Sequence, residues 1–181
     1  FIMKHGVNRL IAVSKDLANY IHTRNLFNKN DIDVIYNGID VSKYDSSAIV
    51  QCESRFGLPQ DALILGALGN IRPAKDYKNA ISALALLTNT SEFSDRPIHF
   101  VIAGHIKKDL HFNLLKHAND LGVADKIHFL GFQQDTAAYL ACIDVFVLSS
   151  KSEGFSIATI EAMAAEKPVV ATRCGGPEEI L

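Results

Sequence analysis

Two glutamates flank a segment that could bind a ligand rich in hydroxyl groups. Glu153 comes directly before Gly154, Phe155 and Ser156, and Glu161 follows eight positions after Glu153. The Glu153 carboxylate can accept hydrogen bonds from a polyol. Glu161 lies in an apolar stretch, where a pair of ribose hydroxyls would satisfy its carboxylate; the alternative is an exposed glutamate on a surface stripe. The backbone N–H groups of the three residues after Glu153, at the start of a helix, would suit an anion.

Two basic residues form a second candidate group. Arg72 and Lys75 lie on a short segment after the apolar run 63–68. An arginine can hold a phosphate through two parallel N–H groups, and a lysine acts as a point charge. A diphosphate would therefore suit the pair, and the alternative is that both cations meet only solvent.

A glycine follows each apolar run in the second part of the sequence. The five are Gly69, Gly104, Gly131, Gly154 and Gly175. A glycine allows a ligand to approach the backbone closely, but it is also the common residue of tight turns. Both interpretations stay open for any single glycine.

A regular alternation of apolar runs and amphipathic segments positions these residues. The expected strands are apolar on both faces, which is typical of a parallel sheet covered by helices on both sides. The sequence therefore predicts an α/β fold with a doubly wound parallel sheet, in which ligands bind beyond the carboxyl ends of the strands. The expected strands are 63–68, 98–102, 127–130, 145–148 and 168–172, and the expected helices are 77–88, 110–121, 135–142 and 156–166.

The first forty residues follow a different pattern. The expected elements are a strand at 10–13, a helix over 15–27 that Ser14 caps, and a strand at 32–36. A polar, irregular stretch then predicts a domain boundary near residue 40, between a segment 1–40 and a domain 41–181. Position 1 is not Met and the last residues resemble the start of a helix, so we expect a fragment of a longer protein.

Composition excludes several classes of protein. The 181 residues are 48% hydrophobic and 21% charged, as in an ordinary globular domain and unlike a disordered chain. No apolar run reaches the roughly 18 residues that span a bilayer. Eighteen basic and twenty acidic residues give a net charge of −2, so no nucleic-acid partner is expected.

Cysteine and motif content narrow the chemistry further. Cys52, Cys142 and Cys174 are odd in number and far apart, which argues against a disulfide framework and favours reduced thiols in a cytosol. Histidine and cysteine show no metal-ligand spacing, which argues against a zinc site. The sequence has no G-x-G-x-x-G and no G-x-x-x-x-G-K-[ST] motif, which disfavours a dinucleotide-binding fold and a P-loop NTPase.

Six motifs, in the right order along the chain, resemble those of GT-B glycosyltransferases, in particular the large retaining family 4. The segment 153–164 resembles the E-x7-E signature with its E-A-M-A continuation. The others resemble the end of the N-terminal domain with its linker, the phosphate loop and three shorter turns: 12–14 with 34–40, 69–75, 100–104, 129–132 and 175–180. The resemblance covers essentially the whole chain.

The resemblance implies that the chain forms a Rossmann-like half of a GT-B fold. It also implies an enzyme that transfers a sugar from a nucleotide-diphosphate sugar with retention of configuration, and that needs no metal and no other cofactor. Glu153 would contact the donor sugar and support charge at the anomeric centre. Glu161 would hold the ribose, and Lys75 would bind the diphosphate. The implied donor-binding set also includes Arg72, Gly104, Gly154, Phe155 and Ser156, and Phe129, Gly131 and Phe132 would border the nucleobase.

The chain departs from the family pattern at one position. An arginine often follows the first glycine of the phosphate loop, whereas this chain has Asn70, and Arg72 is the expected substitute. The segment 1–40 resembles only the tail of the N-terminal domain, which binds the acceptor in this family and carries a catalytic histidine. No motif identifies His5 or His22 with that histidine, so a fragment of this kind should turn over little or nothing.

The resemblance also implies partners and a location. The acceptor would be a sugar, a lipid-linked sugar or a polysaccharide, and the protein would be cytoplasmic, free or peripherally bound at the inner face of a membrane. Two alternatives stay open: another GT-B enzyme such as a nucleotide-sugar 2-epimerase, or a non-catalytic nucleotide-sugar-binding module. Transfer to an acceptor would disfavour the first, and a biological activity that survives Glu153→Gln would support the second.

Overall fold

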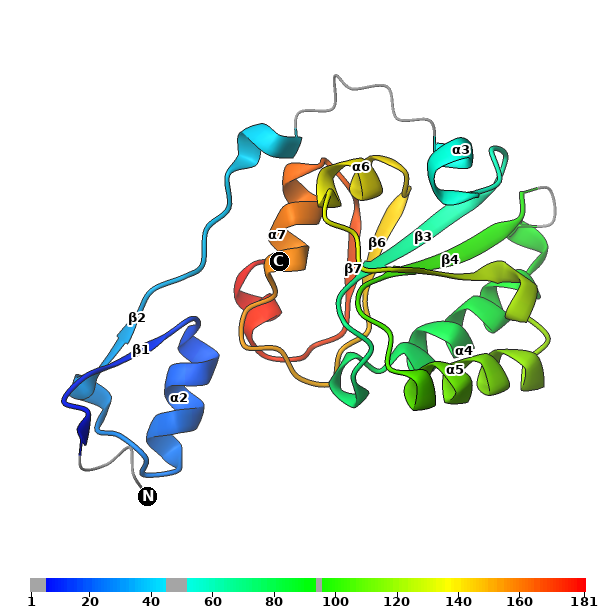
Figure 1. Cartoon of the computed structure of the whole chain (residues 1–181). Helices are drawn as coiled ribbons and strands as arrows, with labels where there is room; N and C mark the ends of the chain where they lie inside the picture. The colour runs from blue at the N-terminus through cyan, green and yellow to red at the C-terminus, as the bar shows by residue number, and fades with distance from the viewer. Residues whose placement is uncertain (1–5, 45–51, 94–95) are drawn as a thin grey trace.

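The computed structural model describes residues 6–44, 52–93 and 96–181. The main sheet has five parallel strands in the order β5-β4-β3-β6-β7 (Figure 1). These strands are β3 (Leu63–Leu68), β4 (Ile98–Ala103), β5 (Ile127–Gly131), β6 (Val145–Leu148) and β7 (Val169–Ala171). The predicted doubly wound α/β fold is confirmed, and each predicted strand of this sheet forms at its expected place.

The strand order creates a switch point at the centre of the sheet. The chain first builds outward from β3 through β4 to β5, and then returns to place β6 on the other side of β3. β3 pairs with β4 along its whole length, but with β6 only near its middle, at Leu65 and Gly66. The loops that follow β3 and β6 therefore leave the sheet in opposite directions, which is where such folds bind ligands.

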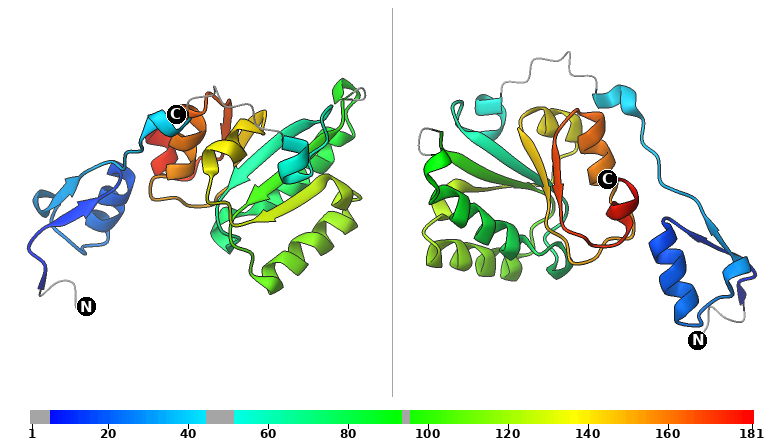
Figure 2. Two further views of the ribbon diagram at one scale, coloured as in Figure 1. Left: turned by 45° about the horizontal axis from the view of Figure 1, so that its top comes forward. Right: turned by 180° about the vertical axis from the view of Figure 1, so that it is seen from behind.

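Helices cover both faces of the sheet (Figure 2). The elements are α4 (Tyr77–Thr88) and α5 (Lys108–Asp120) on one face, and α6 (Thr136–Ala141) and α7 (Ile157–Ala164) on the other. Phe100 and Val101 of β4 point to opposite faces because side chains alternate along a strand. Phe100 packs with Leu84 of α4, and Val101 packs with Tyr139 of α6. None of the helices in the described ranges is long and apolar enough to cross a membrane.

Residues 6–44 contain a second, two-stranded sheet. The elements are β1 (Leu10–Ala12), α2 (Lys15–Thr23) and β2 (Ile32–Val34), and the two strands pair in parallel. The Ser14 hydroxyl accepts the Leu17 N–H at 3.1 Å, so the predicted N-cap is confirmed. The helix ends before the predicted residue 27, because Asn25 has left-handed backbone with φ 55°.

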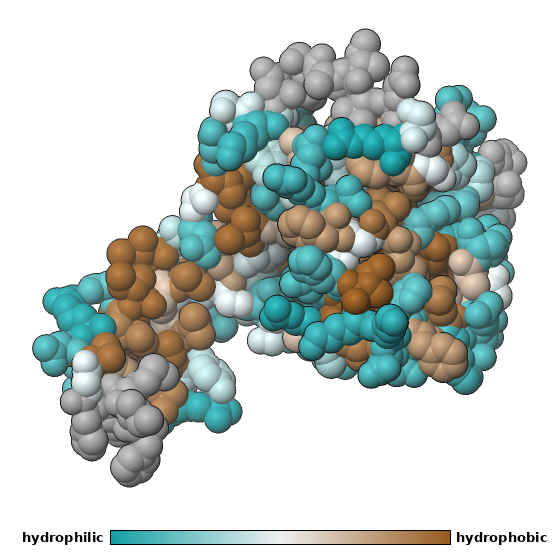
Figure 3. Space-filling view, in the orientation of Figure 1, coloured by the Kyte–Doolittle hydropathy of each residue, from teal (hydrophilic) through white to brown (hydrophobic). Residues whose placement is uncertain are grey.

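Apolar side chains remain exposed around this small sheet. Val7 is 41% exposed, Ile11 61%, Leu26 45% and Ile35 56%, and brown patches mark the same unit in Figure 3. One helix on two short strands buries too little apolar surface to form a core of its own. The chain then passes the predicted boundary near residue 40 and reaches the short helix η2 (Val41–Tyr44).

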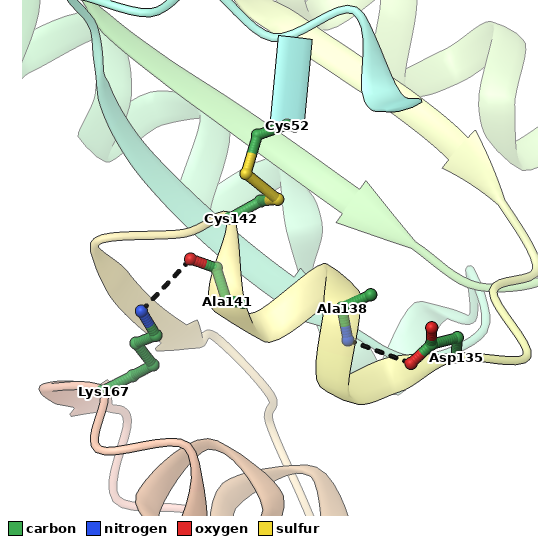
Figure 4. The surroundings of a disulfide bond; sticks show 6 residues. All are labelled: Cys52, Asp135, Ala138, Ala141, Cys142 and Lys167. Carbon is green, nitrogen blue, oxygen red and sulfur yellow. Dashed lines mark hydrogen bonds between the residues drawn. A yellow bond between two sulfur atoms is a disulfide. The ribbon is translucent and has the colours of Figure 1, made fainter. Parts of the chain in front are cut away.

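A disulfide joins Cys52 to Cys142, so the expectation of reduced thiols is wrong for this pair (Figure 4). Cys52 begins α3 (Cys52–Phe56), a helix that the sequence did not predict, and Cys142 directly follows α6. The fold brings the two Cα atoms to 5.5 Å, although 90 positions separate the residues in sequence. Such a long-range pair leaves no local spacing pattern. Cys174 is free and buried.

Candidate active site

Two hydrogen bonds join the loops that follow β3 and β6. The Lys151 N–H donates to the Ala74 carbonyl at 2.8 Å, and the Ser149 hydroxyl donates to the Lys75 carbonyl at 2.8 Å. The short helix η3 (Pro73–Lys75) is thereby held against the segment that carries Glu153. The predicted basic loop and the predicted glutamate loop therefore meet at the switch point of the sheet.

Lys75 and Glu153 form a partly buried ion pair at this edge. The Lys75 Nζ lies 2.7 Å from the Glu153 Oε1, and the two side chains are 19% and 16% exposed. The Ser150 hydroxyl donates to the same Oε1 at 2.6 Å. Exposed ion pairs often contribute less than about 1 kcal/mol, but shielding from solvent strengthens the attraction here. The site thus presents a cation and a carboxylate side by side.

The start of α7 lies next to this pair and is open. Ser156 is the N-cap residue, has left-handed backbone with φ 79°, and pairs its hydroxyl with that of Thr159 at 2.8 Å instead of capping the helix. No hydrogen bond joins the backbone N–H groups of Gly154, Phe155 or Ser156 to another described residue. Strained backbone costs of order 1–3 kcal/mol and clusters at ligand sites. Unpaired N–H groups at a helix start suit an anion.

Glu161 faces polar partners, as its apolar neighbourhood in the sequence requires. The Tyr44 hydroxyl donates to Glu161 Oε1 at 2.7 Å, and the Thr136 hydroxyl donates to the same atom at 3.4 Å. These residues belong to η2, α6 and α7, so three elements meet at one carboxylate. Burial, together with the neighbouring carboxylate, raises the pKa of Tyr44, so the phenol remains a hydrogen-bond donor at neutral pH.

Gly69 and Gly104 allow the loops that follow β3 and β4 to touch. A Cβ on Gly104 would collide with the backbone carbonyl of Gly69, the residue after β3. The Gly69 N–H donates to the Ala103 carbonyl at 2.8 Å, and the Gly104 N–H donates to the Gly131 carbonyl at 2.7 Å. Backbone packing is therefore a sufficient reason for glycine at position 104. The same bonds connect the loops after β3, β4 and β5 along the edge.

The three residues predicted to border the nucleobase do not all face the same way. Phe129 packs edge-on against His111 of α5, with ring centroids 4.5 Å apart. Phe132 is 61% exposed and stacks on His105 at 4.6 Å. Gly131, with φ 70°, turns the chain between the two phenylalanines. An exposed aromatic surface therefore borders the carboxyl edge at Phe132, whereas the Phe129 ring faces α5.

The side chains of Arg72 and Phe155 do not take part in the Lys75–Glu153 ion pair. Arg72 is exposed and lines a hollow of about 220 Å³ together with Lys151. The Phe155 ring is buried, and its centroid lies 5.6 Å from that of Tyr36. Phe155 therefore offers its backbone to the candidate site, while its side chain packs on the segment that leaves β2.

A larger hollow, of about 540 Å³, lies at the opposite edge of the sheet beside the disulfide. Its charged lining residues are Arg96, Asp144 and Lys167, which come just before strands. The Asp144 Oδ2 accepts the Ile64 N–H at 2.7 Å and lies 3.4 Å from Arg96. Asp144 and Arg96 are therefore bound to each other and to the backbone at the edge where the strands begin. For this reason we place the candidate site at the other edge, beyond the carboxyl ends of the strands.

Glu179 makes a contact that sequence reasoning missed. It ends the short helix η6 (Gly176–Glu179), and its carboxylate accepts the N–H groups of Lys15 and Asp16 at 3.0 and 2.7 Å, at the start of α2. The Tyr36 hydroxyl donates to it at 2.8 Å. Although burial opposes the shift, these bonds lower the pKa of Glu179. Residues 6–44 are thereby attached to the last turn of the chain.

Comparison with known proteins gives matches over nearly the whole chain. Residues 52–181 match the family described as glycosyl transferases group 1. The chain is 30% identical to the N-acetyl-alpha-D-glucosaminyl L-malate synthase of Bacillus anthracis, over 99% of this chain and 46% of that protein. It is 32% identical to the D-inositol 3-phosphate glycosyltransferase of Streptomyces scabiei, over 94% of this chain and 40% of that protein. The chain thus spans less than half the length of these relatives.

Solved structures share the fold. HepE from Anabaena, in complex with UDP and glucose, has a TM-score of 0.84 and 26% identity, and the match covers 96% of this chain and 47% of HepE. WaaG, a glycosyltransferase involved in lipopolysaccharide biosynthesis, has a TM-score of 0.79 and 21% identity, over 95% of this chain and 46% of WaaG. The second likeness shows the fold alone.

Proposed function

This chain belongs to the glycosyl transferases group 1 family, as the C-terminal domain of a GT-B glycosyltransferase, and we propose that it binds the nucleotide-diphosphate sugar that serves as donor. The observation that carries the proposal is the Lys75–Glu153 pair beside the open start of α7. A cation and a helix N-terminus suit a diphosphate, and the neighbouring carboxylate suits the hydroxyl groups of a sugar.

In this proposal the diphosphate competes with Glu153 for the Lys75 ammonium. Glu153 Oε1 accepts from both Lys75 and Ser150, so the serine still holds the carboxylate when the lysine moves to the phosphates. The freed carboxylate then accepts hydrogen bonds from the donor sugar. The N–H groups at the start of α7 receive the remaining phosphate charge, and Glu161 accepts the ribose hydroxyls.

The remaining donor contacts of the proposal come from the same edge. Arg72, on the loop of Lys75, is the proposed second phosphate contact. Phe132 and Gly131, at the exposed end of β5, border the proposed nucleobase position. Gly104 keeps the neighbouring loop close enough to contribute its backbone to the site.

We propose that the sugar is transferred with retention of configuration. The bond between the anomeric carbon and the diphosphate oxygen breaks, and the diphosphate keeps the electron pair. The acceptor oxygen bonds to the anomeric carbon on the same face of the sugar, and its hydroxyl proton passes to an oxygen of the leaving diphosphate. Glu153 stabilises the positive charge that develops on the sugar, and Lys75 with the α7 start stabilises the leaving diphosphate. Because these fixed groups meet the charge, the proposal needs no metal, and EDTA should leave the rate unchanged.

The acceptor is proposed to bind opposite the donor loop, partly on residues outside 41–181. A Cβ on Gly154 would lie 3.5 Å from the Val13 side chain, so the loop after β1 faces the donor loop. The proposed acceptor is a sugar, a lipid-linked sugar or a polysaccharide, and no nucleic acid takes part.

The proposed location is the cytoplasm, free or peripherally at the inner face of a membrane. The Cys52–Cys142 bond removes the thiol argument for that location, which then rests on the family alone.

Two other functions of the same fold make different predictions. A nucleotide-sugar 2-epimerase would invert C2 of the sugar without an acceptor, whereas a transferase forms a product only when an acceptor is present. A non-catalytic binding module would keep its biological activity after Glu153→Gln. The match to the glycosyl transferases group 1 family and the likeness to a D-inositol 3-phosphate glycosyltransferase favour the transferase among the three.

Thermal unfolding of the full-length protein with UDP, GDP, ADP and their sugars tests the donor site. A nucleotide at about 100 times its dissociation constant should stabilise the fold by roughly 2.7 kcal/mol. Lys75→Ala and Glu161→Ala should abolish the shift. The matched control is Lys116→Ala, which removes an exposed lysine of α5 that pairs with Asp120. If no nucleotide shifts the melting temperature, the donor-site proposal is wrong.

A further inference from the structure

Tyr44 is buried at the end of η2, in the segment that connects the two sheets. It contacts the candidate site although it does not belong to any of the loops that follow the five strands of the main sheet. Its hydroxyl donates to Glu161 Oε1 at 2.7 Å and lies 3.2 Å from the Thr136 hydroxyl. The ring packs in the core cluster between the main sheet and the helices α6 and α7, so packing fixes the position of the hydroxyl. A phenol whose ring is fixed can determine how a carboxylate is oriented.

The hydrogen bonds to Glu161 have a direction that matters for a ligand. Both bonds, from Tyr44 and Thr136, fall on Oε1. A glutamate has three rotatable bonds, and a ligand that must order it loses affinity in proportion to that freedom. Because Oε1 is held from two sides, much of this freedom is already lost before a ligand arrives. Oε2 can then accept a hydroxyl hydrogen bond with less further ordering.

We propose that Tyr44 is a positioning residue for Glu161 and, through it, for the ribose of the nucleotide. The inference rests on the proposed function, because it assumes that Glu161 accepts the ribose hydroxyls. It adds that the ribose contact depends on a residue of the connecting segment, which lies outside the Rossmann-like sheet and its loops. Tyr44 itself does not touch the ligand, and the effect of its hydroxyl passes through one carboxylate.

The test compares each nucleotide with its 2′,3′-dideoxy form, which lacks both ribose hydroxyls. Dissociation constants of the full-length protein are measured by calorimetry for UDP, GDP and ADP and for the three dideoxy nucleotides. The ratio of the two constants reports the ribose contact alone. In Tyr44→Phe, which keeps the ring, this ratio should fall about ten-fold, the change that corresponds to one hydrogen bond to a charged group. The affinity for the dideoxy form should stay the same.

The matched control is Tyr139→Phe. Tyr139 is buried in the same cluster, and its hydroxyl donates to the backbone carbonyls of Ala67 and Val101 at 3.0 Å. Its loss should lower the melting temperature without changing the ratio. Thr136→Val is the second test variant, should Tyr44→Phe fold poorly, and it should lower the ratio by a smaller factor because its bond is longer.

The outcomes separate the inference from the function on which it rests. If the unsubstituted protein binds none of the six nucleotides, the proposed function fails. If it binds a nucleotide and its dideoxy form equally well, Glu161 does not hold the ribose and the inference is wrong. If the unsubstituted protein discriminates but Tyr44→Phe and Thr136→Val keep the full ratio, the inference alone is overturned. A structural role would weaken both nucleotides equally.

Discussion

At the scale of single residues, the proposed donor site contains the Lys75–Glu153 ion pair, which a bound diphosphate would rearrange. Glu153→Gln removes the charge but keeps the size of the side chain. With the full-length protein, kcat should fall about 10²–10³-fold, because the proposed mechanism loses one group that stabilises transition-state charge. The nucleoside diphosphate should bind at least as tightly as before, because the competitor for Lys75 is weakened. Steady-state kinetics and calorimetry measure the two effects.

The control for this change is Glu166→Gln, an exposed glutamate just after α7. It should leave both kcat and nucleotide binding unaltered. A Glu153→Gln protein with normal kcat would instead support a non-catalytic module. The opposite effects on turnover and nucleotide affinity distinguish a catalytic carboxylate from one that only supports the fold.

A histidine pair on neighbouring strands makes stability depend on pH. His99 Nδ1 and His128 Nε2 lie 2.8 Å apart, and burial lowers the pKa of both rings. Below about pH 6.5 the two histidines therefore bind protons more readily in the unfolded chain than in the folded chain. The melting temperature should fall as the pH drops from about 7 to 5. The double variant H99Q/H128Q should show a shallower fall, whereas H22Q, at an exposed histidine, should keep the original slope.

The proposed site residues that the sequence indicated most clearly are those whose type conflicts with their surroundings. A glutamate among apolar residues at 161, and a lysine beyond a buried strand at 75, are visible without a structure. Tyr44 gave no such signal, because a tyrosine near a chain segment boundary is an ordinary core residue. Its partner is 117 positions away in sequence, and only the fold brings the two together.

At the scale of elements, local patterns predicted the sheet and its helices because each strand is a mostly apolar run, interrupted only by His99 in β4 and His128 in β5 among polar side chains. They did not predict α3, a helix of 5 residues, which is too short to show a period. They also could not decide what the glycines do. The structure decides this at Gly104, where the backbone of the neighbouring loop occupies the space of a side chain.

Gly104→Ala tests whether the loops after β3 and β4 must touch. The added methyl group would overlap the Gly69 carbonyl, so the free energy of unfolding should drop by about 1–3 kcal/mol. Nucleotide affinity should fall as well, because the shifted loop continues into the segment of Lys75. Gly38→Ala is the control, since no atom lies within 4 Å of its Cβ position. Urea denaturation measures both variants, and equal midpoints would contradict the close packing.

At the scale of the whole molecule, contacts between distant parts of the sequence hold the chain in one arrangement. Glu179 joins the last turn to the start of α2, and its bond to the Asp16 N–H spans 163 positions. A pattern search along the sequence compares near neighbours, so it finds capping residues such as Ser14 but not a cap supplied from the other end of the chain. The disulfide escaped sequence analysis for the same reason.

The disulfide gives the last prediction, because it closes a loop of 90 residues between α3 and the end of α6. In the chain-entropy model such a bond stabilises the fold by restricting the unfolded chain, typically by about 2–4 kcal/mol. Reduction with dithiothreitol should therefore lower the melting temperature, while α6 stays packed on the sheet through its buried Tyr139 and Leu140. In C52S/C142S the reductant should have no effect, and C174S, which keeps the pair, should respond like the unsubstituted protein. An unsubstituted protein that melts at the same temperature with and without reductant would show that the pair is not bonded in solution.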